Sequence, residues 1–421
     1  MTCRSRYGTQ VVVSSWIAVF CLFGIRASFA LLKDPLAQAM NWSQAKVTFG
    51  YSFMMIVYAL TAFLCGIIVD RKGSRPVYAI AAIASLAGLM ATGLMRSFAV
   101  YILSFSIMTG IATGMLWVTS TISVRKWYTG KQYASKWGWA FAGAPVSQFV
   151  LTFIVRHILM EDPATTWRLA FIALSLISGF MLLTAFFLAK REPEYYGFEA
   201  FGSVRENTYR DISWSLKQAF SRYAVWGAVA TFLLSMMAEF LIWTQVVSYW
   251  VIDVGWTMAD SAHVYAMIGL AGMVSMPLMG YFADYLVRLV KNEPRGRKIM
   301  LIIGPALGML ACILLLYSHQ SKFFAYTASV FFAVYWAIVP GGAVGYIGSL
   351  YGRKTLGKIW GLCTLMVMGT GPFLGSLTGG YLKDLTGHFN HALYFAGGSF
   401  LLSAILAFSL PVKLKYPGNG Q

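Results

Sequence analysis

The sequence is poor in charged residues, histidine and cysteine. Only 11% of its 421 residues are charged, while 58% are hydrophobic, and a soluble protein would carry about 25% charged residues. The mean hydropathy is +0.65. An ordinary soluble domain is therefore excluded. Unbroken apolar runs of about 20 residues also exclude a membrane β-barrel, whose strands alternate apolar and polar positions. We expect an all-α membrane protein.

The sequence also lacks the motifs of an enzyme. It has no phosphate-binding Walker loop, no spaced pair of carboxylates and no Ser/His/Asp arrangement on a recognisable scaffold. We therefore expect no catalytic activity, no cofactor and no ATP-driven pump, so ion or substrate gradients would supply the energy. The cysteines are odd in number and scattered, which predicts neither a disulfide framework nor a metal site. They are Cys3, Cys21, Cys65, Cys312 and Cys363.

Twelve apolar runs are long enough to span a bilayer. The first follows Arg4 and Arg6 and is interpreted as an uncleaved helix rather than a signal peptide. The longest polar stretch, 190–222, separates two sets of six, which predicts a bundle over 1–189, a cytoplasmic linker over 190–222 and a second bundle over 223–421. The predicted spans are 11–32, 47–68, 77–95, 98–123, 137–157, 168–189, 223–250, 259–286, 299–317, 323–349, 357–382 and 392–411.

The basic residues are unevenly distributed along the chain. The net charge is +18, and 25 of the 33 Lys and Arg fall in the termini and one set of alternate loops. This asymmetry follows the positive-inside rule and places both termini in the cytoplasm. A nucleic-acid partner would need a contiguous basic face with base-reading groups, and none is visible. The expected environment is the lipid bilayer of the inner membrane.

Each predicted half carries a copy of one short pattern. Gly66-x-x-x-Asp70 closes the second span, and Gly280-x-x-x-Asp284 closes the eighth. A basic loop follows each copy, although Tyr285 stands where the first copy has Arg71. Such duplication is typical of secondary transporters built from repeats, whose substrate site lies near the midplane between the halves.

The first copy predicts a gating loop. Glycine lets two helices approach closely, and the aspartate can meet a helix N-terminus or a basic side chain. The arginines can join helices at the cytoplasmic face and contact anionic lipid. The alternative is an ordinary tight basic turn. The loop residues are Gly66, Asp70, Arg71, Gly73 and Arg75, with Asp284 in the second copy.

The segment Gly66–Arg75 resembles the signature loop of the major facilitator superfamily, Gly-x-x-x-Asp-Arg-x-Gly-x-Arg. The whole chain is similar to that family's twelve-helix plan. The resemblance implies two pseudo-symmetric six-helix bundles and transport by alternating access. Shorter phrases resemble the bacterial monocarboxylate-transporter-like and oxalate/formate-antiporter-like branch. They are Phe23–Phe29, Asn41–Ala45, Arg125–Tyr128, Trp167–Phe171 and Pro193–Phe198.

The sequence departs from these relatives at three places. The monocarboxylate branch often has an arginine in the eighth span, and this chain has none there. Parts of the first and fourth spans are similar to organophosphate:phosphate antiporters. Those proteins have a second arginine in the seventh span, where this chain has Met237, Ala238 and Glu239. The fifth span lacks the full glycine-proline motif of drug/proton antiporters, which disfavours drug export.

Arg26 is the first candidate for substrate binding. It lies roughly 21 Å along the first span, at a rise of 1.5 Å per residue. Its guanidinium is planar, always charged and suited to a carboxylate or phosphate, and an ionisable group inside a bilayer usually has a function. The alternative is a static ion pair with Glu239 or a contact to a helix-end carbonyl. Lys33 shares the helix face of Arg26 and either binds substrate or pairs with Asp34 at the outer interface.

Glu239 lies about as deep in the seventh span, the counterpart of the first. Burial raises the pKa of a carboxyl group, and a neighbouring cation lowers it. A carboxylate balanced between the two effects can take up a proton near neutral pH and couple transport to it. Two alternatives remain open: a permanent partner for Arg26, or a contact to a substrate ammonium group.

Aromatic residues make up 16% of the chain. Several lie in mid-span, where Trp and Tyr suit a pocket for a small, partly apolar molecule. Each is alternatively a packing or lipid-facing residue. The candidates for the pocket wall, with one glutamine, are Tyr58, Trp117, Gln148, Trp243, Tyr335 and Trp336.

The sequence thus predicts a monomeric secondary transporter of a small organic anion, with a carboxylate favoured. Its partners would be that anion and either protons or a counter-substrate. One alternative is a zwitterionic solute, and another is a metal or metallophore, suggested by His263 and Met267 together with Met236 and Met237. An alternative from another class is a membrane sensor that binds ligand without transport.

Overall fold

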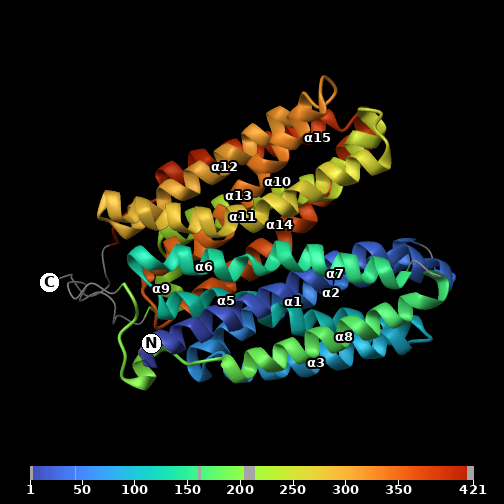
Figure 1. The fold of residues 1–421 in the computed structure, drawn as a ribbon. Helices are drawn as coiled ribbons and strands as arrows, with labels where there is room; N and C mark the ends of the chain where they lie inside the picture. Colours follow the sequence, from blue (N-terminus) through green and yellow to red (C-terminus); the bar gives the residue numbers. More distant parts are fainter. Residues whose placement is uncertain (1–2, 43, 160–162, 203–213, 415–421) are drawn as a thin grey trace. The chain divides into compact units, whose positions relative to one another are not determined.

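The computed structural model describes residues 3–42, 44–159, 163–202 and 214–414. Within these ranges twelve helical segments are long and apolar enough to cross a membrane, which confirms the predicted all-α membrane protein (Figure 1). The described residues form no β-strand, only an isolated bridge between Tyr128 and Phe201. The α-helices are α1 (Cys3–Ala39), α2 (Gln44–Lys72), α3 (Arg75–Leu94), α4 (Phe98–Tyr101), α5 (Gly110–Trp127), α6 (Tyr133–Phe141), α7 (Gly143–Leu159), α8 (Pro163–Leu188), α9 (Leu216–Phe220), α10 (Tyr223–Ser248), α11 (Met258–Val290), α12 (Glu293–Leu316), α13 (Lys322–Tyr351), α14 (Leu356–Thr386) and α15 (Asn390–Ser409).

Three spans are built from more than one helical segment. In the fourth, the π-helical stretch η1 (Ile102–Thr109) joins α4 to α5, and in the fifth, the 3₁₀ turn η2 (Gly130–Gln132) leads into α6 and α7. In the seventh, α10 continues into the π-helical stretch η5 (Tyr249–Asp253). All of these keep the backbone hydrogen-bonded within the segment, as hydrocarbon requires.

Local capping residues set several helix ends. The side chain of Thr257 accepts from the backbone N–H of Asp260 at the start of α11, and Asn292 does the same for Arg295 at the start of α12. Side-chain oxygens of this kind satisfy N–H groups that have no partner inside the helix. Gly387, with φ of +80°, ends α14 in the left-handed conformation that glycine adopts without strain.

The chain forms two compact units. The first contains Met1–Tyr128, Trp139–Phe201 and Trp360–Leu365, and the second contains Thr129–Gly138, Gly202–Ile359 and Met366–Gln421. The start of the fifth span therefore groups with the C-terminal helices, and a short part of α14 groups with the N-terminal ones. The predicted division into 1–189, 190–222 and 223–421 stays a prediction.

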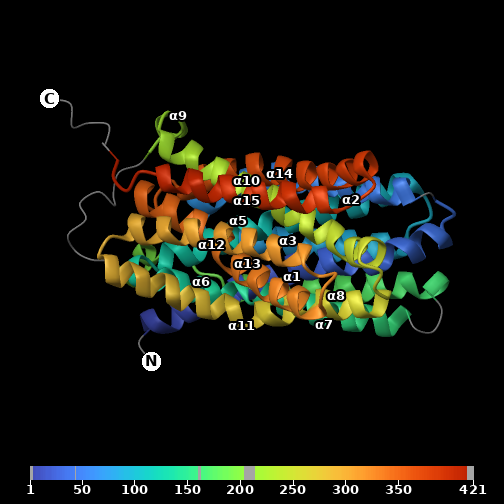
Figure 2. The ribbon, with the colours of Figure 1, turned by 90° about the horizontal axis from the view of Figure 1, so that it is seen from above.

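The same helix pairs recur in the two units. The third and sixth spans pack together as α3 with α8, and the ninth and twelfth pack as α12 with α15. Likewise α2 packs with α5 and α11 with α13, while α1 packs with α8 and α10 with α15. Figures 1 and 2 show each set as a bundle of long helices. The internal duplication seen in the sequence thus appears in the packing.

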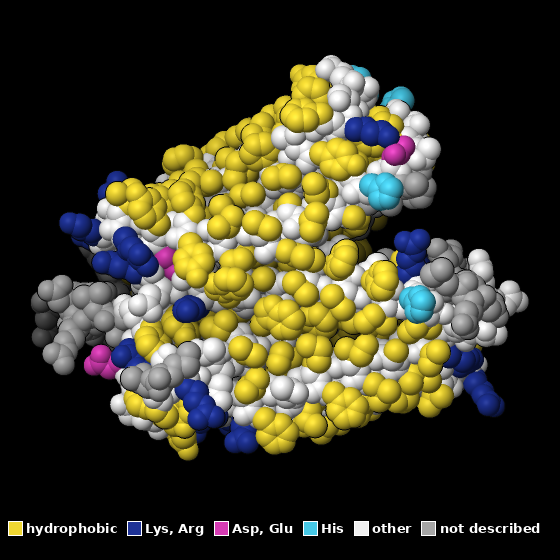
Figure 3. Space-filling view, viewed as in Figure 1, with side chains coloured by type: hydrophobic (Ala, Val, Ile, Leu, Met, Phe, Trp, Pro, Cys, Tyr) yellow, Lys and Arg dark blue, Asp and Glu magenta, His cyan; other side chains and the backbone are white. Residues whose placement is uncertain are grey.

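The flanks of the helices are apolar. Large hydrophobic side chains such as Phe153, Phe180 and Phe373 are exposed, at 67%, 64% and 63% of their surface. On the face seen in Figure 3, hydrophobic side chains cover the middle of the helices and Lys and Arg lie near the helix ends. Exposed apolar surface on this scale suits contact with lipid rather than water.

Candidate functional site

Helix α1 places Arg26 against an aromatic ring in the first unit. The guanidinium carbon lies 4.3 Å from the ring centroid of Tyr58 and 5.9 Å from that of Phe23, which is the geometry of a cation–π contact. Nε and Nη2 of Arg26 are buried, and no described residue accepts a hydrogen bond from them. No described carboxylate forms an ion pair with Arg26 either. The guanidinium therefore keeps two donors for a further acceptor.

Two predicted aromatic residues lie close to this cation. Tyr58 is fully buried, and its hydroxyl has no hydrogen-bond partner among the described residues. Trp117 is 4% exposed and packs edge-on against Phe23 and Phe141, with ring centroids 6.3 and 5.8 Å apart. Phe23 thus links Arg26 to Trp117. Within the first unit, the structure brings Arg26, Tyr58 and Trp117 together.

Among the described residues, two further candidates in this unit form no polar contact with Arg26, Tyr58 or Trp117. Gln148 is half-buried on α7, and Lys33 is exposed on α1. Neither forms a hydrogen bond or ion pair with Arg26 within the described ranges. The side chain of Asp34, the alternative partner of Lys33, lies outside the described residues.

Helix α10 places Glu239 in the interior of the second unit, where it is 4% exposed. The Tyr335 hydroxyl lies 2.9 Å from Oε2 of Glu239 and 3.0 Å from the backbone carbonyl oxygen of Ser235. Among the described residues no Lys, Arg or His forms an ion pair with Glu239. Its charged form is therefore stabilised by a hydrogen bond and not by a cation.

A cluster of aromatic rings packs around Trp243, close to this carboxyl group along α10. Trp243, one helical turn beyond Glu239, packs edge-on against Trp336, Tyr265 and Phe332, with centroids 5.4, 5.4 and 5.6 Å apart. Sequence reasoning predicted Trp243 and Trp336 but missed the other two rings. With aromatic residues at 16% of the chain, no pattern distinguishes Tyr265 or Phe332 from ordinary packing residues.

The predicted gating loop, Gly66–Arg75, takes part in a charge network in the first unit. Nζ of Lys126 lies 3.3 Å from Oδ1 of Asp70 and 3.3 Å from Oε2 of Glu192. One ammonium thus joins the ends of α2 and α5 to the segment after α8. Gly66 is buried within α2. Lys126 was missed as a partner of Asp70, although it belongs to one of the phrases that carry the family resemblance.

Backbone geometry explains the rest of this loop. Gly73 has φ of +78°, a conformation that favours glycine, and a Cβ added there would lie 2.9 Å from Cγ of Arg191 and would have to displace that side chain. The carbonyl of Arg71 accepts a hydrogen bond of 3.1 Å from Nη2 of the same Arg191. The guanidinium of Arg75 lies 4.7 Å from the ring centroid of Phe186. These contacts hold the loop against the end of α8.

In the second copy, Asp284 caps a helix. Its two carboxylate oxygens accept from the backbone N–H groups of Ala134 and Ser135 at the start of α6, at 2.9 and 2.7 Å. Nη2 of Arg297 lies 2.9 Å from Oδ1 and 2.6 Å from the carbonyl of Gly130. All these residues belong to the second unit. A carboxylate at a helix N-terminus is favoured by the exposed N–H groups and the helix dipole. Arg297 was not predicted.

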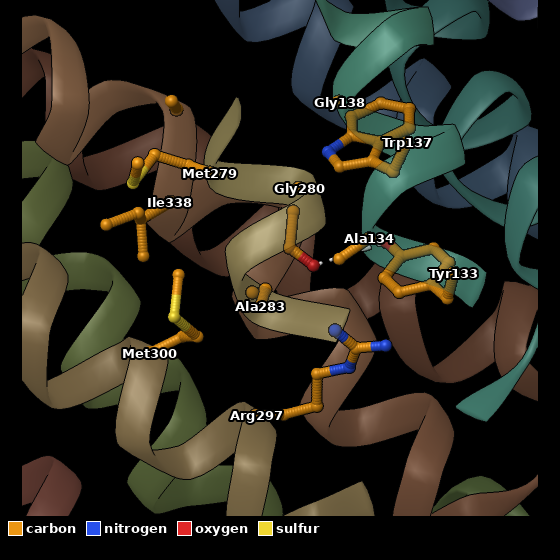
Figure 4. A pocket seen from close by; sticks show the side chains of 13 residues that line it. Tyr133, Ala134, Trp137, Gly138, Met279, Gly280, Ala283, Arg297, Met300 and Ile338 are labelled. Carbon is orange, nitrogen blue, oxygen red and sulfur yellow. Dashed lines mark hydrogen bonds between the residues drawn. The ribbon is translucent and has the colours of Figure 1, made fainter. Parts of the chain in front are cut away.

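A small pocket lies beside this capping site. Figure 4 shows the guanidinium of Arg297 below α6, which carries Tyr133 and Trp137, while Met279 and Ile338 lie on the opposite wall. None of the predicted substrate-binding residues lines it. The pocket thus adjoins Arg297, the partner of Asp284, and not the candidate substrate residues.

A model of the Major Facilitator Superfamily matches residues 15–368. The chain belongs to this superfamily. It is 23% identical to the hexuronate transporter of Bacillus subtilis, covering 94% of this chain and 93% of the relative. It is 22% identical to monocarboxylate transporter 13 of Rattus norvegicus, covering 96% and 89%. The crystal structure of a human organic anion transporter has a TM-score of 0.73 at 14% identity, covering 97% and 100%, which supports the fold.

This superfamily member is a multi-pass membrane transporter. The expected resemblance to the family and its monocarboxylate-transporting branch is confirmed by these matches. For the metal alternative, the described residues contain no group of three or more His, Cys, Asp or Glu side chains that could hold an ion. That alternative therefore gains no support from the geometry.

Proposed function

We propose that this transporter moves a small organic anion, with a carboxylate as the recognised group, by alternating access. The observation that carries the proposal is the pair of buried donors on Arg26, Nε and Nη2, which no described residue satisfies. These two N–H groups point along the same edge of the guanidinium and match the two oxygens of a carboxylate. A charge inside a membrane bundle is retained at a cost in free energy, which a bound anion would offset.

The ring of Tyr58 supports this role for Arg26. It lies against one face of the guanidinium and restricts its orientation, while the edge with the two donors remains available. The Tyr58 hydroxyl supplies a third donor without a described partner. The names of two relatives agree with an acid substrate, since one is a hexuronate transporter and another is a D-galactonate transporter of Escherichia coli, 23% identical to this chain.

Glu239 is proposed to carry the coupling proton, or to set the charge of the site if the transporter exchanges one anion for another. The second candidate function is transport of a zwitterion, favoured by the position of Trp243 beside the carboxyl group, because a carboxylate and a Trp face both attract an ammonium group. Glu239→Gln separates the two. A zwitterion transporter loses binding, whereas a proton symporter keeps exchange and loses accumulation driven by a pH gradient.

The test is uptake into proteoliposomes of a panel that includes a hexuronate, D-galactonate and lactate. Hydrogen bonds to a charged group contribute about 1.5–3 kcal/mol, so Arg26→Gln should raise the KM about 10- to 150-fold. Arg156, an exposed arginine on α7 of the same unit, provides the control, and Arg156→Gln should leave the KM unchanged. A wild-type KM in Arg26→Gln would contradict the anion-binding role.

The distribution of basic residues supports the proposed topology. We infer that both termini lie in the cytoplasm, because the termini and alternate loops hold most of the Lys and Arg. Relatives from bacteria support an inner membrane, and the monomeric state stays a prediction. Transport by alternating access, as proposed, involves no covalent step and no catalysis. Reporter fusions at each terminus, read from the cytoplasmic side, test the orientation.

A further inference from the structure

The hydroxyl of Tyr335 faces two acceptors but has one hydrogen. Oε2 of Glu239 lies 2.9 Å away and the carbonyl oxygen of Ser235 lies 3.0 Å away. A phenol donates one hydrogen bond at a time. Because Tyr335 lies on α13 and both acceptors lie on α10, this hydrogen bond joins the two helices in either position.

The protonation state of Glu239 decides which acceptor is used. When the carboxyl group is ionised, it is the stronger acceptor, because a hydrogen bond to a charged group is roughly twice as strong as a neutral one. When a proton binds to Glu239, the carboxylic O–H becomes a donor and can donate to the Tyr335 oxygen. The Tyr335 hydrogen then turns to the carbonyl of Ser235, and no proton leaves the tyrosine.

We propose that Tyr335 is the positioning residue that transmits the protonation of Glu239 to the backbone of α10. This inference rests on the proposed function, in which Glu239 takes up the coupling proton. Ser235 lies four residues before Glu239, so its carbonyl is the helical acceptor for the Glu239 backbone N–H. A second donor at that carbonyl competes with the helical bond. Protonation therefore replaces one charge-assisted hydrogen bond between α10 and α13 with two neutral ones, and the new bond at the Ser235 carbonyl weakens the helical hydrogen bond of that turn of α10.

Besides Tyr335, the Trp243 indole acts on Glu239 as a hydrogen-bond partner. The titratable group that acts on Tyr335 from α12 is Cys312, a neutral thiol. From α15, the ring of Phe400 packs on Tyr335 at 4.6 Å and Ser403 bonds to the Ser235 hydroxyl at 2.8 Å. Among the described residues no Lys, Arg or His forms an ion pair with the carboxyl group.

Infrared difference spectra between low and high pH, recorded on the protein in lipid without substrate, test the switch. The C=O band that disappears in Glu239→Gln identifies the Glu239 carboxyl group. In Tyr335→Phe this band should move to higher frequency, because its hydrogen bond is lost. In wild type, the C–O band of Tyr335 should change in the same titration, and in Glu239→Gln it should keep its low-pH position at every pH. Tyr346 is on the same helix but bonds to the carbonyl of Pro411, so Tyr346→Phe should match wild type.

Transport of D-galactonate gives the second readout. In Tyr335→Phe, accumulation driven by a pH gradient should fall at least fivefold, as in Glu239→Gln, while counterflow at equal pH stays within twofold. An unshifted Glu239 band in Tyr335→Phe, or a Glu239 group that never titrates, would overturn the switch. Failure of wild type to transport any acid on the panel would instead overturn the proposed function, and the infrared measurement would still decide the role of Tyr335.

Discussion

The ion pair between Asp284 and Arg297 is expected to be the most sensitive electrostatic contact in the second unit. Both side chains are 1% exposed, and their charged atoms lie 2.9 Å apart. Oδ1 and Oδ2 of Asp284 also accept from two backbone N–H groups of α6. Removing one member of a buried pair leaves the other charge without compensation, which costs about 3–5 kcal/mol.

We therefore expect Asp284→Ala and Arg297→Met each to lower the free energy of unfolding by about 3–5 kcal/mol. Neither loss should add fully to the other, because once one charge is gone, removing its partner relieves an unpaired buried charge. The double variant should thus lose less free energy of unfolding than the two single variants together, by at least about 1 kcal/mol. A coupling of this size is in the range found for residues in contact. Equilibrium SDS denaturation of the protein in detergent, followed by tryptophan fluorescence, measures these free energies.

Glu293 offers a matched control. Its carboxylate lies 3.7 Å from Nη2 of Arg297 and is 16% exposed, so it is farther away and better solvated. Glu293→Gln should lower the free energy of unfolding by less than Asp284→Ala or Arg297→Met does, because attraction falls with distance and with solvation. Strictly additive losses in Asp284→Ala and Arg297→Met, or a loss in Glu293→Gln as large as theirs, would refute the reasoning.

Two further predictions concern α11 and its neighbours. A Cβ at Gly280 would lie 2.3 Å from the carbonyl oxygen of Ala134, whereas a Cβ at Gly269 on the same helix would meet nothing within 4 Å. Gly280→Ala should therefore lower the thermal midpoint, while Gly269→Ala should leave it unchanged or raise it, and equal effects would contradict the close approach of α6. At the start of α11, the hydrogen bond from Lys322 at 2.8 Å lowers the pKa of Asp260. The pair thus stabilises the fold above the ordinary carboxyl range and loses this contribution as the pH falls through the lowered pKa. Lys322→Met should remove that part of the acid sensitivity of the thermal midpoint, and an unchanged pH profile would refute it.

Hydrophobic runs of membrane length were sufficient to predict the helices. The seventh span is an example, since the predicted 223–250 corresponds to α10 and the first residues of η5. A bilayer offers backbone groups no water, so a long apolar run has few options besides a helix. The π-helical stretches at Ile102–Thr109 and Tyr249–Asp253 were not predicted, because no local composition rule distinguishes them from an α-helix of the same apolarity.

Candidate residues were found where the residue type is rare in its environment. Arg26 and Glu239 stand out because ionisable residues are costly in mid-span, and the repeated glycine–aspartate spacing identified Asp70 and Asp284. Their partners were harder to identify. Lys126 and Arg297 belong to basic stretches at helix ends, where many Lys and Arg occur for reasons of topology alone. The local sequence does not indicate which of these side chains is buried against a carboxylate.

The sequence alone determined the membrane environment, the twelve spans and the duplicated plan, because hydropathy and charge bias act along the chain and need no knowledge of its packing. Only the tertiary structure decided that Lys126 neutralises Asp70, that Arg297 supports Asp284, and that Tyr335 stands between Glu239 and the carbonyl of Ser235. Those contacts join residues that are 13 to 100 positions apart, and their distances depend on how whole helices pack.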